Sequence, residues 1–569
     1  EEERFVSFSP DGKSIVYASE RDGKWDIYQS TKTREDEIFF FASTLLEEKK
    51  VFSSKEDNYH PEYSPDGKEI AYIENKTTLK IFNVKSGKHR TLLTSKDLVY
   101  FSDGGQEFKW SPDSKWLAVG YSPTLANNEI LLIDASGEGK RMNLTESGHG
   151  DWNPKWVDNG NRIIWVTTRD GKRGYANSSG KFQDVYCMYM NKEAWEKSKL
   201  SKDELALMKE MEEASKKDKK ETEDKDKDKK DDEKKEEEVK NVKIDFDGLT
   251  DRIRRLTIHS SDMNDMTLSK DGEKLYYISK FESKYNVWVT DLRTKETKIL
   301  APIGANYAGF SWDAKMENLF ILSNGKPMTI DLKTGKTKAI SISGTMKLDA
   351  TAERKQMFEH VWKRTKLMFY TPDFHGVDWE FYGEAYRTKV ESLGNDAEFA
   401  ELLSEMLGEL NVSHAGARYR GAKAIDQTAS LGIYRDYSYS KDGIKITEVL
   451  ENGPLDKVEF GIEPGTIIKK IDGITVSATM EDAQLLNKKA GDYTALEIYN
   501  PTSKETKTIS VKPINGKEES SLTYQRWVKQ NAEEVAKLSK GKLGYVHVPG
   551  MGDGPYRNLY GKIMGKFHE

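Results

Sequence analysis

The sequence predicts a mainly β, multidomain protein, and three observations support that prediction. A hairpin-like phrase recurs along residues 1–343, a helical pattern follows, and alternating strand patterns return after it. The length of 569 residues allows three or four domains. With 36% hydrophobic and 11% aromatic residues, the chain can form several cores, yet it contains no apolar run of the roughly 18 residues that a membrane-spanning helix needs.

The recurring phrase is an aromatic or apolar residue, then Ser-Pro-Asp-Gly or a variant, then Lys and an alternating apolar run. Proline fixes φ and Asp-Gly supplies a turn between two strands. Ser9, Ser64 and Ser111 of the first copies are 55 and 47 residues apart, and another strand and turn follow each copy. Four strands at such a spacing are typical of a β-propeller blade. We predict a propeller of six to seven blades over 1–343. A long β-sandwich is the alternative, disfavoured because sandwiches do not repeat their turn sequence.

One repeat carries a charged insertion at about 192–241. A helical pattern runs from Glu193 to Met211, and 22 of the 24 residues from Ser215 to Glu238 are Lys, Asp or Glu. Such a stretch cannot bury enough apolar surface to offset its ordering entropy. We expect a solvated loop; a charged guard over a channel mouth is the alternative.

A small helical domain is predicted over 346–424. Between Asp349 and Ala417, apolar residues recur at spacings of three and four, and Asp378 precedes Trp379 as a helix N-cap. The apolar positions are Phe358, Val361, Trp362, Phe399, Leu402, Leu403, Met406, Leu407 and Leu410.

Residues 428–515 have the pattern of a PDZ domain. The segment Leu431-Gly432-Ile433 precedes a strand-like alternation at Ile444–Val449, and Gly-rich turns follow it. In PDZ domains, backbone N–H groups of such a loop bind a terminal carboxylate, and a strand edge then pairs with the peptide. We therefore predict peptide binding at Leu431, Gly432 and Ile433, with a rigid spacer as the alternative.

Four segments resemble the helical core domain of the tricorn proteases, serine peptidases related to the C-terminal processing peptidases. They are 357–362, 369–379, 382–386 and 407–416. The order of parts is also similar, with a second, α/β core domain beginning within 520–569 at Leu543. The resemblance implies an endopeptidase that degrades short or unfolded peptides, with the propeller as a channel or filter and a hexameric ring as the assembly. Tricorn has two propellers before its core, and here the second core domain barely begins, so the chain is expected to be cut at both ends.

The same resemblance assigns the catalytic residues. Histidine can exchange a proton with a serine nucleophile near neutral pH, and by resemblance His414 is the general base and Ser413 the hydroxyl that orients it. Of the other histidines, His375 is expected to cap or pack, and His360 to be core or surface. His547 is expected to lie in an alternating strand that begins at Leu543, in a structural role. The nucleophile and a further Glu belong to the second core domain in this family, and the chain contains no Gly-x-Ser-x-Gly. We expect these 569 residues to be inactive alone.

Composition excludes several other function classes. The net charge of −6 does not favour nucleic acid, and the single Cys187 excludes a disulfide framework. No His-Glu-x-x-His occurs, so no metal or cofactor is expected. The rival function is a non-catalytic propeller and PDZ scaffold that binds peptides; a prolyl-oligopeptidase-like enzyme fits less well, because it carries no PDZ domain. The resemblance implies a cytoplasmic location, or a periplasmic one if the full-length protein has a signal peptide.

Overall fold

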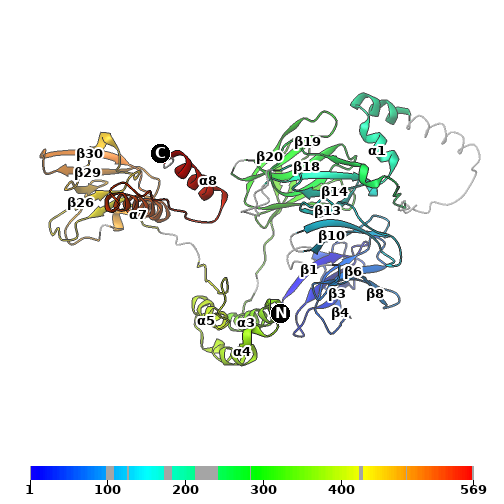
Figure 1. Cartoon of the computed structure of the whole chain (residues 1–569). Coiled ribbons are helices and arrows are strands. Elements are labelled where there is room, and N and C mark those ends of the chain that lie inside the picture. The colour runs from blue at the N-terminus through cyan, green and yellow to red at the C-terminus, as the bar shows by residue number, and fades with distance from the viewer. Residues whose placement is uncertain are drawn as a thin grey trace, which may run out of the picture. The chain divides into compact units, whose positions relative to one another are not determined.

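The computed structural model describes residues 2–97, 108–124, 127–171, 182–211, 241–281, 283–345, 347–421, 427–481 and 483–566 (Figure 1). The chain divides into two compact units, Glu1–Met346 and Lys347–Glu569. The charged run at 215–238 lies outside the described residues. None of the helices in the described part is long and apolar enough to cross a membrane.

In its described residues, the first unit consists of six four-stranded antiparallel sheets, and the prediction of a mainly β fold is confirmed. Within each sheet every strand pairs with its neighbour in the chain. The first three sheets comprise β1 (Glu3–Phe8), β2 (Ser14–Ser19), β3 (Asp26–Lys32) and β4 (Leu46–Phe52); β5 (Asn58–Tyr63), β6 (Glu69–Glu74), β7 (Thr78–Asn83) and β8 (His89–Leu93); and β9 (Phe108–Trp110), β10 (Trp116–Thr124), β11 (Asn127–Asp134) and β12 (Arg141–Asn143). The last three comprise β13 (Asp151–Val157), β14 (Arg162–Thr167), β15 (Asp184–Tyr189) and β16 (Ile253–Arg255); β17 (Asp262–Leu268), β18 (Lys274–Lys280), β19 (Tyr285–Asp291) and β20 (Thr297–Ala305); and β21 (Ala308–Trp312), β22 (Leu319–Ser323), β23 (Lys326–Ile330) and β24 (Thr337–Ala339).

The repeated phrase forms the turn between the first two strands of a sheet. Ser9 Oγ donates to Asp11 Oδ1 at 2.6 Å and accepts from the backbone N–H of Ser14 at 2.9 Å. Ser64 makes the corresponding bonds to Asp66 and Glu69 at 2.7 and 3.0 Å. The same two bonds recur around Ser111 and Ser269. The serine and the aspartate therefore repeat because their side chains close the turn.

Successive sheets pack against each other through their first strands. Contacts join β1 to β5, β9 to β13, β13 to β17, and β17 to β21. Polar pairs reinforce them: Lys109 Nζ on β9 lies 3.1 Å from Glu62 on β5, and Lys155 on β13 pairs with Asp265 on β17. Burial raises the pKa of the Glu62 carboxyl group. The charge of the neighbouring Lys109 has the opposite, smaller effect. This arrangement is compatible with the predicted propeller; the number of blades stays a prediction.

The insertion begins with helix α1 (Lys192–Lys199), whose N-cap Asn191 accepts from the backbone N–H of Ala194. Residues 202–211 are also helical, so the predicted helix is found as two, separated at 200–201. Strands β15 and β16 pair across the insertion, with Cys187 opposite Arg254. Cys187 is buried, and burial raises the pKa of its thiol to about 12.

The second unit begins with three helices: α3 (Ala350–Met368), α4 (Trp379–Arg387) and α5 (Asp396–Gly408). Asp378 caps α4 as predicted, accepting from the backbone N–H of Phe381. Trp362 and Trp379 each donate their indole N–H to the other's backbone carbonyl at 3.1 Å. Trp362 also lies against Gly383, where an added Cβ would be 2.2 Å from Trp362 Nε1. A larger residue at position 383 would therefore clash with the indole ring. The core consists of Phe358, Phe374, Trp379, Tyr386, Val390, Phe399, Leu402, Leu403, Met406 and Leu410.

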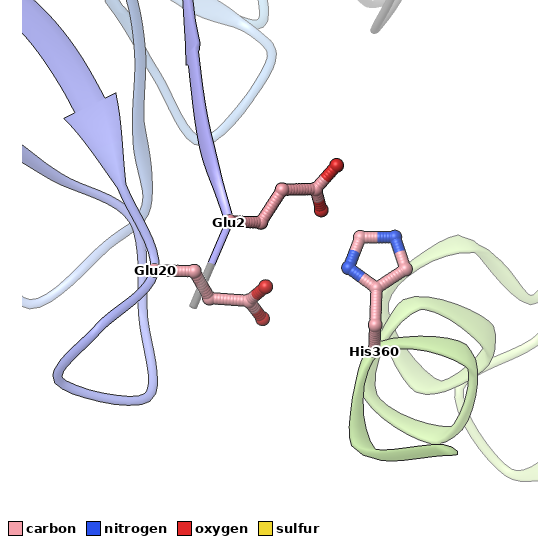
Figure 2. A group of neighbouring side chains, drawn as sticks. All are labelled: Glu2, Glu20 and His360. Atoms are coloured by element: carbon pink, nitrogen blue, oxygen red, sulfur yellow. The ribbon is translucent and has the colours of Figure 1, made fainter. Parts of the chain in front are cut away.

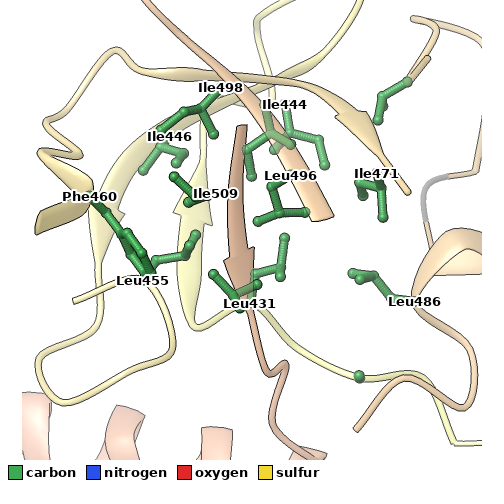
Figure 3. Close-up of a cluster of buried hydrophobic side chains, with 14 residues drawn as sticks. Leu431, Ile444, Ile446, Leu455, Phe460, Ile471, Leu486, Leu496, Ile498 and Ile509 are labelled. Atoms are coloured by element: carbon green, nitrogen blue, oxygen red, sulfur yellow. The ribbon is translucent and has the colours of Figure 1, made fainter. Parts of the chain in front are cut away.

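A further sheet, with its own hydrophobic core, follows the three helices (Figure 3). The strand order is β25-β26-β27-β29-β30, with β28 paired to β27, and Leu431, Ile446 and Leu496 are among the buried residues. The predicted strand Ile444–Val449 is β26. The other elements are β25 (Ile433–Arg435), β27 (Ile467–Ile471), β28 (Ile474–Thr475), α6 (Ala483–Leu486), β29 (Thr494–Asn500) and β30 (Glu505–Val511).

The last described segment is helical where the sequence suggested the start of an α/β domain. It contains α7 (Gly516–Leu538), α8 (Asp553–Gly561) and a π-helical turn, Lys562–Lys566. The alternating run at Leu543–Val548, expected as a strand, has no regular secondary structure, because no strand in the described residues pairs with it. Instead, His547 hydrogen-bonds to Tyr524 on α7.

Candidate functional site

Ser413 and His414 lie in the loop that follows α5, beside a pocket of about 710 Å³. The pocket is lined on one side by residues 407 and 410–416 of this loop and of the end of α5, and on the other by the end of α3 and the residues after it. Both Ser413 and His414 are exposed. The two residues predicted to be catalytic therefore face solvent, where a peptide can reach them.

The loop is held in place by the helices before it. Leu410 is buried in the core of the three helices, and Tyr386 on α4 donates to Glu409 at 2.8 Å. Burial, together with this bond to Glu409, raises the pKa of Tyr386 to about 12. Asn411 and His414 have left-handed backbone conformations, with φ of 49° and 62°, which cost free energy for residues other than glycine. The loop thus turns sharply at both positions and presents Ser413 and His414 outward.

Ser413 and His414 do not hydrogen-bond to each other, and no other described side chain bonds to either of them. A histidine that acts as a general base needs a serine within hydrogen-bond reach and a group that orients its second ring nitrogen. The described residues supply neither partner for His414. The predicted role of His414 as a general base therefore requires partners outside the described residues.

Tyr370 and His375 form a polar pair on the opposite side of the pocket. The Tyr370 hydroxyl, from the segment after α3, hydrogen-bonds to His375 Nε2, and the two rings are 5.2 Å apart. His375 lies in a single 3-10 turn, Phe374–Gly376, whose N-cap Asp373 accepts from the His375 backbone N–H. His375 was expected to cap or pack; it orients a tyrosine that lines the pocket.

The other histidines are candidate metal ligands. His360 lies on α3, and Glu2 and Glu20 lie at the ends of β1 and β2 (Figure 2). In the described residues of each unit taken by itself, no three His, Cys, Asp or Glu side chains bring ligand atoms within reach of one metal ion.

The hydrogen-bonding groups of the predicted carboxylate-binding loop, in the domain predicted to be a PDZ domain, are partly taken up by neighbouring residues. Gly432 has φ of 67°, and an added Cβ would lie 2.9 Å from Pro454 Cδ, so glycine is required there. Its N–H donates to Ser430 Oγ at 3.0 Å, and its carbonyl accepts from the N–H of Leu450. Leu431 points into the core and Ile433 pairs with Val449. A carboxylate at this loop must therefore displace Ser430 to reach the Gly432 N–H.

Comparison with known proteins gives a consistent result. The profile of the tricorn protease C1 domain matches residues 350–408, which end just before the Ser413–His414 loop. The chain is 26% identical over 537 residues to a tricorn-like protease C-terminal subunit of Sulfurisphaera tokodaii, covering 89% of this chain and 57% of that protein. It is 25% identical over 538 residues to a tricorn protease homolog of Saccharolobus solfataricus, covering 89% of this chain and 46% of that protein.

The fold agrees with the sequence comparison. The crystal structure of the tricorn protease superposes with a TM-score of 0.73 at 15% identity, covering 99% of this chain and 53% of that one. This chain is a homologue of the tricorn proteases. It spans about half the length of the curated tricorn relatives given above.

Two features of the candidate site were not found by sequence reasoning. One is the pairing of Tyr370 with His375, and the other is the pocket that brings Tyr370 to the same cavity as His414. The signal was present in part, since both residues lie in the stretch 369–379 on which the resemblance was based. The sequence did not indicate the left-handed conformation of Phe374 and His375, because residue type does not predict it.

Proposed function

We propose that this protein is a tricorn-type serine endopeptidase that degrades short or unfolded peptides. His414 is its general base, and Ser413 orients that base through a further carboxylate. The observation that supports the proposal is the position of Ser413 and His414: an exposed loop directly after the segment that matches the C1 domain, open to a pocket. Both side chains are exposed, and His414 has a left-handed backbone conformation.

The nucleophile and the remaining acid belong, in this proposal, to residues outside these 569. The chain matches only about half of its relatives' length, and His414 has no described partner. The domain order follows the sequence prediction: a propeller at 1–343 that admits unfolded peptide, the first core domain at 346–424, a PDZ domain at 428–515, and the start of the second core domain at 520–569. A hexameric ring and a cytoplasmic location belong to the same proposal and rest on family resemblance.

The decisive test compares His414→Ala with His259→Ala in the full-length protein. The substrate is an unfolded peptide with a fluorescent leaving group, and a fluorophosphonate probe reports the nucleophile. Loss of a general base reduces kcat by about 10²- to 10⁴-fold, whereas His259 is exposed in the first unit and its substitution should leave turnover unchanged. Ser413→Ala should cause a smaller loss than His414→Ala.

The 569-residue chain alone provides the second arm of the test. We expect it to bind peptide without turnover and without reaction with the probe. Turnover by this chain, abolished by His414→Ala, would show that its own residues include the nucleophile. Full-length protein that binds peptides but neither hydrolyses them nor reacts with the probe would favour the non-catalytic scaffold.

A further inference from the structure

The pocket beside His414 has a second wall, whose residues have no part in the proposed general-base chemistry. On that side Met368, Phe369 and Tyr370 line it, and Leu407 and Val412 close it from the side of α5. The side chains of Met368, Phe369, Leu407, Leu410 and Val412 give the pocket an apolar part, beside the polar groups of Tyr370, Asn411, Ser413 and His414. Thr365 also lines it, but its hydroxyl already donates to the backbone carbonyl of Val361 at 2.8 Å. An apolar cavity with few polar groups is the usual form of a side-chain subsite.

Tyr370 is the polar group that stands out on this wall. Its side chain is 70% exposed, so it makes little contribution to the core. Its hydroxyl nevertheless has a defined partner, the Nε2 atom of His375. When His375 donates through Nε2, the Tyr370 O–H remains available to donate to a carbonyl oxygen in the pocket. A surface tyrosine that lines a pocket and whose hydroxyl has a fixed partner is placed for recognition.

The chain holds His375 beside Tyr370 against an unfavourable backbone conformation. Phe374 and His375 are consecutive left-handed residues, with φ of 51° and 56°, a combination that non-glycine residues avoid. A stack of aromatic rings maintains it. Phe369 and Phe374 are 4.8 Å apart and within 4° of parallel, and Phe374 and Trp379 are 5.9 Å apart and within 6°. Strain that the surrounding structure enforces is concentrated at functional sites.

We propose that this pocket receives an apolar side chain of the peptide substrate, and that Tyr370, oriented by His375, is the residue that positions the peptide against His414. The apolar walls of Met368, Leu407 and Val412 select the side chain, while the Tyr370 hydroxyl donates to a peptide carbonyl. Tyr370 and His375 are positioning residues and take no part in proton transfer. The proposal rests on the proposed peptidase function and adds a substrate preference to it.

The test uses the full-length protein and peptides that differ only in the residue beside the scissile bond: Leu, Phe, Ala or Asp. The wild-type protein should prefer Leu and Phe. Tyr370→Phe should raise KM about three- to tenfold, the effect of one uncharged hydrogen bond, with kcat little changed. His375→Leu should match it, and His375→Gln, whose amide can still donate, should restore most of the loss. Tyr370→Ala should in addition abolish the preference for Leu and Phe.

Tyr437→Phe is the matched control, because Tyr437 is 84% exposed and lies in the PDZ-like domain; it should leave all constants unchanged. If Tyr370→Ala keeps both kcat/KM and the peptide preference within twofold of wild type, while His414→Ala is inactive, the positioning role is wrong and the peptidase function stands.

If the full-length protein hydrolyses none of the peptides, a peptide-binding measurement tests the pocket proposal instead. Titration of the 569-residue chain with the Phe peptide should shift the imidazole NMR signals of His375 and His414, and Tyr370→Ala should weaken that shift. In that case the pocket proposal holds although the peptidase function fails. Absence of a shift in the wild-type chain overturns the pocket proposal.

Discussion

Helices α5 and α7 lie in the same compact unit but use their apolar residues in opposite ways. The 13 residues of α5 include four buried ones, Phe399, Leu402, Leu403 and Met406. The 23 residues of α7 include none, and Trp527 and Leu538 are 47% and 74% exposed. The first helix is held by a completed core. The second depends on its capping and on surface contacts, so its apolar face is available for other parts of the protein.

The largest expected difference lies between two aromatic residues truncated to alanine. Phe358→Ala removes a fully buried ring that packs against α4 and α5, and should lower the free energy of unfolding of the helical domain by about 3–5 kcal/mol. Trp527→Ala on α7 should cost about 1 kcal/mol or less, because half of its ring is already in water. Urea denaturation, monitored by hydrogen exchange at the amides of α4 and α7, measures both losses of unfolding free energy. Equal losses would show that α7 is as well packed as α5.

A smaller effect is expected at the start of α7. Asn515 accepts from the backbone N–H of Lys517 and Glu518, and the Glu518 carboxylate accepts from the Asn515 N–H, forming a capping box. Asn515→Ala should destabilise the helix by about 1 kcal/mol and should speed amide exchange in its first turn. The same substitution at the α5 cap, Asn395→Ala, should change exchange less, because the buried face of α5 holds that helix in place. The opposite order would contradict the comparison.

The smallest effect is expected from a surface ion pair that joins α7 to β26. Arg526 donates to both oxygens of Glu448 at 2.5 and 2.6 Å, and this holds the pKa of Glu448 below its usual range. The stabilisation is therefore fully present above the unfolded pKa of about 4.3, and it is lost as the pH falls through the lower folded value. Because both side chains are partly exposed, the coupling should be about 0.5 kcal/mol.

A double-mutant cycle of Arg526→Met and Glu448→Gln measures this coupling, with exchange of the α7 amides as the readout. The coupling energy should be present at pH 7 and should disappear in acid once Glu448 is protonated. A coupling that persists in acid would mean that the interaction between the two side chains does not depend on the charge of Glu448. The contact of Arg526 with the Tyr434 ring, 4.8 Å away, cancels in the cycle.

Parts of the fold that depend on local residue chemistry could be predicted from the sequence. Asp378 as a helix cap, Ile444–Val449 as a strand and the Ser-Pro-Asp-Gly turns all follow from short-range preferences. The expected strand at Leu543–Val548 did not form, because a strand needs a partner and residue alternation does not supply one. Ser413 and His414 lie in the loop after α5, and their catalytic role stays a prediction. That Tyr370 lines the same pocket as Ser413 and His414 could not be predicted, since it depends on how the end of α3 meets the loop after α5. The bond of Tyr370 to His375 could not be predicted either, since it depends on left-handed residues at 374 and 375.

The strand order within the six sheets has a consequence for how the first unit folds. Every strand pairs with the strand next to it in the chain, and the serine-bridged turns close the first hairpin of several sheets locally. Contact order is therefore low within these sheets, except in the fourth, where β15 and β16 pair across the insertion. Low contact order favours fast formation of each of the other sheets from its own stretch of sequence. The contacts between first strands form later and join sheets that already exist. A turn mutation such as Ser64→Ala should then slow the formation of a single sheet and leave the others to fold at their own rate.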